Sequence, residues 1–416
     1  MDTSTSTVLL ADRRIPSGGD WLSKKELAQL TPTTLKDRML ALAPLAARHA
    51  REAEELRRPV DAVWNAIRKS GFFYQFVPKK YGGMETTPED FVAASLPLAE
   101  SCPSTAWVAT FCAEHNWILA HFPEQTQDEI WGGAFPYIVA PFPASPPGVA
   151  SKVPHGYRVT GHWRWGTGVM HADWILASAM TEFAEGSQPG IVLLRAEQAT
   201  VLDTWHVDGM IGTGSNDIVV KELIIPEHHA IPLAPMQRGR PHGSPLHDSP
   251  IYRIPALPFL ALTASIAALG AARIAISAYR EKLAAHVKMG QQTSQAQRPA
   301  AQSRLARAEL MTQSATSLVV GVARDLLVMN EIEEPEQISH RIRARATLAY
   351  AVDLCRQATQ ILCESAGSSA HGLASPLQRA WRDVNVIGTH VVFDIDTANE
   401  LYGRSMLGLP PNAFLV

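Results

Sequence analysis

The sequence lacks the features that would tie it to nucleic acid, a membrane or a metal ion. Its 416 residues carry a formal net charge of −3, which gives no electrostatic preference for nucleic acid or an anionic membrane. No run of 18 apolar residues free of charge is apparent, so no membrane-spanning helix is predicted. The four cysteines form no CxxC pair, and no spacing of His, Cys, Asp and Glu is typical of a metal site. We therefore expect buried, reduced thiols and no metal.

Nucleotide-binding signatures are missing too. No GxGxxG motif follows a strand-like run, and no GxxxxGK motif followed by Ser or Thr occurs. The chain therefore shows no nicotinamide site of its own, and a redox reaction would need electrons from another protein. Residues 1–22 are rich in Ser and Thr and then basic, without the continuous apolar core of a secretion signal. We expect them to be a flexible leader of a cytoplasmic protein.

Hydrophobic residues make up 46% and charged residues 19% of the chain, the balance of a globular protein with a large interior. The apolar pattern predicts a helical domain (23–134), a β-domain (135–236), a long polar loop (237–256) and a four-helix bundle (257–416). The long helices are expected at 257–289, 297–330, 337–366 and 376–404. A loop of this length is usually a lid, a binding loop or an arm to another subunit. The fold class is α+β, mostly α.

Two glycine-rich loops, Gly161–Gly168 and Gly209–Asp217, lie among the short strand-like runs of the β-domain. These runs are expected at 157–160, 174–177, 190–194 and 218–225. Because glycine has no Cβ, such loops let a flat cofactor with polar edges approach the backbone closely. Their hydroxyl and N–H groups favour a flavin site and do not suggest a Rossmann unit.

The three-part layout and the two loops resemble the acyl-CoA dehydrogenase fold, from Leu27 or nearby to Val416. Two classes share that fold: dehydrogenases that hold FAD and desaturate acyl-CoA thioesters, and monooxygenases that take reduced flavin from a separate reductase. The segment Gly212–Asp217 resembles the GTGSxD loop of the monooxygenases. The segment Trp165–Trp174 ends like their SGxxHAxW pattern, although Thr167 replaces their usual serine and Trp-x-Thr is the dehydrogenase form.

The stretch after Arg382 and Asp383 distinguishes the two classes. Many dehydrogenases carry a catalytic glutamate about eight residues after such a pair, because removing a thioester α-proton needs a carboxylate base near the flavin. This sequence has His390 there, as the monooxygenases have histidine. The alternative is an FAD-dependent acyl-CoA dehydrogenase whose base has moved to Glu114 or Asp394. A third hypothesis is a binding protein that kept the fold and lost the chemistry.

The resemblance implies roles for individual residues. His390 and His115 are expected to be catalytic, since histidine titrates near working pH. The flavin is expected to contact Trp165, Thr167, Gly168, Gly212, Thr213, Gly214, Ser215, Ser368 and Ser369. The substrate is expected to contact Trp107, Asn116, Trp117 and Phe142, most of which are aromatic and stack well on a ring.

The implied reaction is that of an oxygenase component. Reduced FMN, with FAD as the alternative, and O2 form a flavin C4a-hydroperoxide that hydroxylates a small aromatic or heteroaromatic molecule, a phenol or an indole. A flavin reductase is the implied partner. The Ala-rich segment Thr263–Ala278 and the loop Gly367–Ala370, which resembles the family loop that often approaches a neighbouring subunit's flavin, predict a homotetramer or at least a dimer. A lone subunit would expose an apolar face of the bundle.

Overall fold

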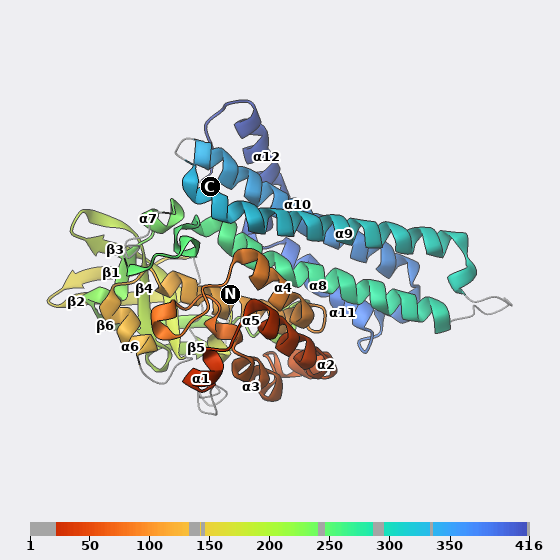
Figure 1. The fold of residues 1–416 in the computed structure, drawn as a ribbon, viewed down its shortest axis with the longest axis horizontal. Helices are drawn as coiled ribbons and strands as arrows, with labels where there is room; N and C mark the ends of the chain where they lie inside the picture. Colours follow the sequence, from red (N-terminus) through yellow and green to blue (C-terminus); the bar gives the residue numbers. More distant parts are fainter. Residues whose placement is uncertain are drawn as a thin grey trace, which may run out of the picture.

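The computed structural model describes residues 22–132, 142, 146–239, 246–285, 295–332 and 336–413. Helices from the first third of the chain and a mixed sheet gather at one end of a long helical bundle, and helices α8 and α9 extend away from the sheet (Figure 1). This arrangement confirms the predicted fold class, α+β with mostly helix. Almost all of the predicted leader lies outside the described residues, and the predicted domain boundaries remain a prediction.

The N-terminal helices follow the signals expected from the sequence. Thr31 and Thr87 cap α2 and α4 with their side chains, and each is followed by proline at the first helical position. Gly71 ends α3 with a φ of +94°. The helices are α1 (Lys24–Leu27), α2 (Pro32–Leu56), α3 (Asp61–Ser70), α4 (Pro88–Ala99), α5 (Pro103–Leu119) and α6 (Glu124–Trp131).

A seven-stranded sheet forms the middle of the described chain, in the order β5-β6-β2-β1-β3-β4-β7. All neighbouring strands are antiparallel except β1 and β3. The sequence predicted β2, β3, β4 and β6 but missed β1, β5 and β7; β5 and β7 have only three residues each. The strands are β1 (Gly148–Val153), β2 (Gly156–Trp163), β3 (Trp174–Phe183), β4 (Gly186–Arg195), β5 (Thr200–Leu202), β6 (Asp217–Pro226) and β7 (Ala230–Pro232).

The C-terminal bundle differs from the prediction in its last helix. A single helix was expected over 376–404, but it is broken between Gly388 and Ile395. His390 and Asp394 each accept a backbone N–H as N-caps, and two caps in succession start two new helical segments. The long helices are α8 (Ala256–Ala285), α9 (Pro299–Val328), α10 (Glu336–Ser365), α11 (Pro376–Gly388) and α12 (Ile395–Met406).

Helix α8 is the centre of this bundle. By length and composition alone, Ala256–Ala284 is apolar enough to cross a membrane, although it contains Thr263, Ser265 and Arg273. However, 83% of its apolar window is buried inside the protein. Its small residues allow close packing: a Cβ on Gly270 would come within 2.2 Å of Ala99 backbone atoms. The apolar run therefore forms the core of the bundle.

The predicted polar loop at 237–256 is partly built into the core. It begins at the end of the short helix α7 (Ala234–Gln237) and contains a 3-10 helix, η9 (Pro250–Arg253). Tyr252 donates to the Phe76 carbonyl at 3.2 Å, and the Ile251 carbonyl accepts from Trp117 Nε1 at 2.7 Å. Residues 240–245 lie outside the described part. For the segment around η9, the expectation of a lid was wrong because Ile251 and Tyr252 are buried.

Candidate active site

His390 lies at the break between α11 and α12. Its Nδ1 accepts the backbone N–H of Val392 at 3.4 Å, the contact that caps the 3-10 helix η13 (Val391–Phe393). The acceptor role assigns the ring proton to Nε2, which is left as a donor. The residue is partly exposed, and desolvation of the ring by the surrounding protein lowers its pKa to about 4. The imidazole is therefore neutral at physiological pH.

An aromatic wall on α5 runs from His390 to His115. The Trp107 ring meets His390 edge-on with centroids 5.6 Å apart and stacks on Phe111 at 4.6 Å. Phe111 meets His115 edge-on at 6.2 Å. Residues four positions apart share a helix face, and Trp107 and His115 stand about 12 Å apart along the axis. The two histidines therefore mark opposite ends of one wall.

Arg345 on α10 fixes the segment that carries His390. Its buried guanidinium donates to the carbonyls of Val391 at 3.0 Å and Val392 at 3.2 Å. Sequence reasoning missed this role, because Arg341, Arg343 and Arg345 alternate with apolar residues as they would on a solvated face. Only Arg343 of the three is exposed.

Three hydroxyl groups from the two glycine-rich loops form a buried chain. Thr213 Oγ1 lies 2.9 Å from Ser215 Oγ, which lies 2.9 Å from Thr167 Oγ1. Beside them Trp165 is 65% exposed at a φ of +60°, an uncommon conformation for so large a residue. Convergent hydroxyls next to an exposed flat indole are the polar and apolar partners that a flavin ring requires.

The glycines of the second loop serve a different purpose from the one expected. A Cβ on Gly214, whose φ is +60°, would lie 2.5 Å from the Arg57 carbonyl oxygen. A Cβ on Gly212 would lie 3.2 Å from Ala53. Helix α2 thus fills the space that the missing side chains leave, and the loop is held in place by this packing. In the first loop, Gly168 turns the chain at a φ of +85° into a 3-10 helix.

The turn that carries Thr213 and the ring of His390 contact neighbouring turns of α5. The turn η6 (Ile211–Thr213) packs on this helix, because a Cβ on Gly212 would also lie 3.2 Å from Ser104. Ser104 stands one helical turn before Trp107, which contacts His390. Neighbouring turns of one helix therefore carry the candidate flavin loop and the candidate catalytic histidine.

The two acids that a relocated dehydrogenase base would use are engaged elsewhere. Glu114 is fully buried, accepts a hydrogen bond from Thr263 on α8, and burial raises its pKa well above the ordinary value. Asp394 caps α12 by accepting from Thr397 N at 2.8 Å, and hydrogen bonds to Thr397 lower its pKa. Neither side chain lies in the wall between His390 and His115.

Comparison with known proteins agrees with this geometry. Residues 262–395 match the family "acyl-CoA dehydrogenase, C-terminal domain". A pigment production hydroxylase of Rhodococcus sp. is 36% identical over 92% of this chain and 98% of its own. The oxygenase component of an FADH(2)-dependent resorcinol hydroxylase of Rhizobium sp. is 31% identical over 92% of this chain and 97% of its own.

Solved structures show the same relationship. The HsaA monooxygenase from M. tuberculosis matches with a TM-score of 0.86 and 29% identity, over 93% of this chain and 100% of that chain. XiaF from Streptomyces sp., in complex with FADH2 and glycerol, matches with a TM-score of 0.84 and 31% identity, over 94% and 98%. The chain belongs to the flavin-dependent monooxygenases of the acyl-CoA dehydrogenase fold. It therefore uses reduced flavin, and the dehydrogenase alternative finds no support.

Not all residues expected to contact the substrate lie along the wall of this monooxygenase. Asn116 is fully buried, donates to the Phe73 carbonyl at 3.2 Å and accepts from Trp131 Nε1 at 3.2 Å. Trp117 is fully buried and bonded to Ile251. Both belong to the core, because their polar groups are paired there. Trp107 lies in the wall. Phe142 is partly buried against the hydrophobic core, and its neighbours in the sequence lie outside the described residues.

Ser368 and Ser369 lie at the far end of the monooxygenase bundle. They start the 3-10 helix η12 (Ser368–His371), and Ser369 Oγ accepts from Lys282 Nζ at 2.6 Å. From Arg345 beside η13 to Ser365, helix α10 runs for about 30 Å. These serines therefore lie far from His390 within one subunit.

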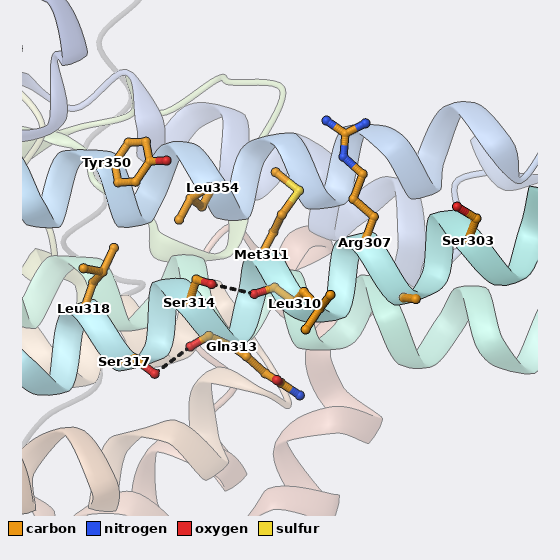
Figure 2. A pocket seen from close by; sticks show the side chains of 11 residues that line it. Ser303, Arg307, Leu310, Met311, Gln313, Ser314, Ser317, Leu318, Tyr350 and Leu354 are labelled. Atoms are coloured by element: carbon orange, nitrogen blue, oxygen red, sulfur yellow. Dashed lines mark hydrogen bonds between the residues drawn. The ribbon is translucent and has the colours of Figure 1, made fainter.

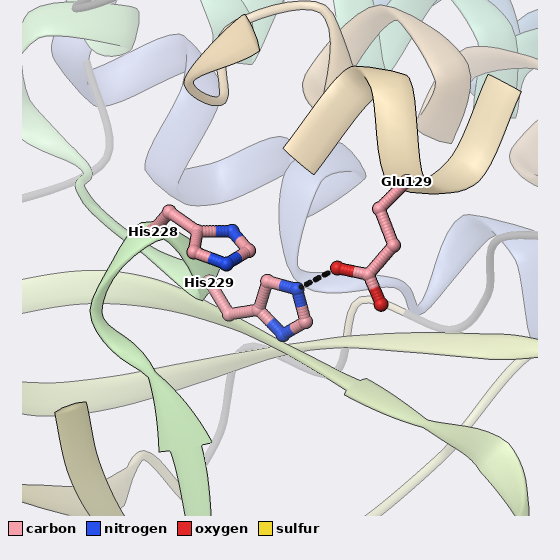
Figure 3. Close-up of side chains that lie close together, drawn as sticks. All are labelled: Glu129, His228 and His229. Atoms are coloured by element: carbon pink, nitrogen blue, oxygen red, sulfur yellow. Dashed lines mark hydrogen bonds and ion pairs between the residues drawn. The ribbon is translucent and has the colours of Figure 1, made fainter. Parts of the chain in front are cut away.

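One group of described residues comes close enough to share a metal ion: Glu129, His228 and His229 (Figure 3). Glu129 already pairs with His229 at 2.7 Å and with Arg195 at 3.0 Å, so its charge is matched by the protein. These contacts tie α6 to Arg195 at the end of β4 and to the turn that follows β6, and the expectation of no metal stands as a prediction. The four cysteines are free and buried as expected.

Proposed function

We propose that this monooxygenase is the oxygenase component of a two-component system that hydroxylates a small phenol, with reduced flavin delivered by a separate reductase. The observation that carries the proposal is neutral His390, whose Nε2–H can donate, against Trp107 on α5, one helical turn from Ser104, on which the turn η6 of the candidate flavin loop packs. The missing nicotinamide motif supports the separate reductase. The resorcinol hydroxylase relative, 31% identical, is named for a phenol.

Thr167, Thr213, Ser215 and Trp165 would hold the flavin. The three hydroxyl groups, which now contact one another, would instead hydrogen-bond the polar edge of the flavin ring, and the Trp165 indole would pack on the face of that ring. Bound reduced flavin supplies two electrons, so that one oxygen atom of O2 leaves as water and the other enters the substrate. The names of two relatives that are 31% identical to this chain mention FADH2, so the experiment below compares FADH2 with FMNH2.

His390 would act as a neutral donor at the reacting oxygen atom. With a pKa of about 4 the ring stays neutral throughout the neutral range, and its single N–H, at Nε2, can donate a hydrogen bond. Arg345 keeps the donor in place through η13. Trp107 and Phe111 stack on the aromatic substrate and exclude water, and His115 contacts its far end.

The experiment is an anaerobic titration of the protein with FADH2 and FMNH2, followed by oxygen in the presence of resorcinol or indole. Tighter binding of reduced than of oxidised flavin, with hydroxylated resorcinol formed at the expense of hydrogen peroxide, supports the proposal. Product from indole alone moves the substrate class to heteroaromatics. Absence of binding to either reduced flavin overturns the proposal.

We also propose that the chain assembles as a homotetramer in the cytoplasm. A groove of about 930 Å³ runs along α9 and α10, and its side chains include Arg307, Leu310, Met311, Leu318, Tyr350 and Leu354 (Figure 2). Leu310 is 62% and Tyr350 50% exposed, a face suited to a second copy. Assembly would also allow Ser368 and Ser369 to reach a neighbour's flavin. Light scattering should give four times the 45.3 kDa of one chain, and a mass of one chain would contradict assembly.

A further inference from the structure

The loop that carries the candidate flavin hydroxyls is held by α11, the helix that leads to His390. Met210 donates its backbone N–H to Asp383 Oδ1 at 2.6 Å, and Asp383 is buried. Met210 has a φ of +53°, an uncommon conformation for a side chain of this kind. Its carbonyl accepts from Trp205 Nε1 at 3.2 Å and from Thr213 N at 3.1 Å. The Asp383 bond therefore secures the residue from which the η6 turn starts.

Arg382 clamps the preceding residues of the same loop. Its Nη1 donates to the Asp208 carbonyl at 2.5 Å, and its Nη2 donates to Glu54 Oε1 at 2.6 Å. Gly209 lies so close that a Cβ there would sit 2.4 Å from the Arg382 carbonyl oxygen. Arg382 and Asp383, two successive residues of α11, therefore both hydrogen-bond to this loop. Glu54 connects Arg382 to α2.

We propose that Asp383 is a positioning residue. It holds the η6 turn, and with it Thr213 and Ser215, at a fixed position relative to His390. Asp383 lies in α11, and His390 follows two residues after the end of that helix at Gly388. The helix that contacts the flavin loop therefore also leads to the proposed donor. This inference rests on the proposed function, since it concerns where the flavin sits relative to His390.

The charges around Asp383 make its hydrogen bond to Met210 sensitive to pH. Burial raises its pKa to about 7, with Glu54 on α2 adding to the rise, while the Met210 N–H, Arg382 and Arg379 oppose it. The buried thiol of Cys102 faces the same carboxyl. An ionised carboxylate is a stronger acceptor than a carboxylic acid. Flavin binding should therefore weaken as pH falls through about 7, when Asp383 gains a proton.

The test compares reduced-flavin affinity and product per flavin in the full chain for wild type, Asp383→Ala, Asp383→Asn and a control. Asp383→Ala removes the acceptor and should raise the Kd for reduced flavin about tenfold, with more hydrogen peroxide per flavin. Asp383→Asn keeps an acceptor oxygen and should restore affinity within about threefold, now independent of pH between 6 and 8. The control is Asp325→Asn on α9, an exposed aspartate paired with Arg343, which should bind as wild type does.

The outcomes separate this inference from the proposed function. Wild type that binds neither reduced flavin overturns the proposed function and this inference with it. If wild type binds reduced flavin and Asp383→Ala has the same Kd and the same product per flavin, the inference alone is overturned. If Asp383→Ala does not fold, the pH profile decides. An Asp383→Asn Kd that changes with pH as in wild type contradicts the role of this carboxyl.

Discussion

His390→Ala removes the one side-chain donor that the account places at the reacting oxygen. Loss of a preorganised donor of this type costs about 2.7–4 kcal/mol, or a factor of about 10²–10³ in the step it serves. Reduced flavin would still react with O2, so the electrons should appear as hydrogen peroxide. The structural cost is small, since His390 is an exposed residue and its capping bond to Val392 is long, at 3.4 Å. The variant should remain folded, with a loss of about 1 kcal/mol or less.

The assay measures hydroxylated product and hydrogen peroxide per reduced flavin added. His390→Ala should give almost only peroxide, whereas His390→Asn, which keeps both a donor and an acceptor, should fall between it and wild type. His155→Ala, at an exposed histidine in the turn between β1 and β2, serves as the matched control. Product per flavin unchanged in His390→Ala would refute the assignment.

The pH profile tests the same residue without a mutation. Because the folded pKa of His390 is about 4, below the ordinary 6.5, the ring gains its second proton only well below neutrality. Coupling should therefore show no His390 step between pH 6 and 8. A step near 6.5 that disappears in His390→Ala would contradict the neutral-donor account.

Three further changes probe the supports of the site. Arg345→Met leaves the Val391 and Val392 carbonyls without their donor and should cost about 3 kcal/mol by urea unfolding, with poorer coupling; exposed Arg343→Met should do neither. Gly214→Ala forces a Cβ against Arg57 at positive φ and should cost about 2–5 kcal/mol, whereas Gly403→Ala, with open space around it, should be neutral or stabilising. Glu114→Gln should keep hydroxylation. As pH rises above 4.5, the free energy of unfolding of the variant should also exceed that of wild type by up to about 1.4 kcal/mol per pH unit. The reason is that Glu114 keeps its proton in the folded state and loses it in the unfolded state.

Local sequence signals predicted many elements because their causes are local. Thr87 followed by proline starts α4 as a cap followed by a fixed φ, and Gly71 ends α3 with a positive φ. The break at His390 escaped prediction, since Val391 and Val392 continue the apolar pattern of a helix. Only the caps made by His390 and Asp394 interrupt it.

The site was predicted unevenly for a similar reason. The hydroxyl groups of Thr167, Thr213 and Ser215 lie in loops of small residues that are visible in the sequence, and their contact with flavin remains a prediction. Asn116 and Trp117 were expected at the substrate, but their polar groups pair with Phe73 and Ile251, because helix periodicity does not say which face turns toward these residues. The bonds of Arg345 and Asp383 to backbone groups were not predicted, since their partners are distant in sequence.

The most direct test of the central claim is the yield of hydroxylated resorcinol when anaerobically reduced flavin, bound to the protein, meets oxygen with no reductase or nicotinamide present. We expect a single turnover in which most of the reduced flavin yields hydroxylated product, with tighter binding of reduced than of oxidised flavin. Oxidation that returns all of the electrons as hydrogen peroxide, for both FADH2 and FMNH2 and for phenolic and indolic substrates alike, would contradict it.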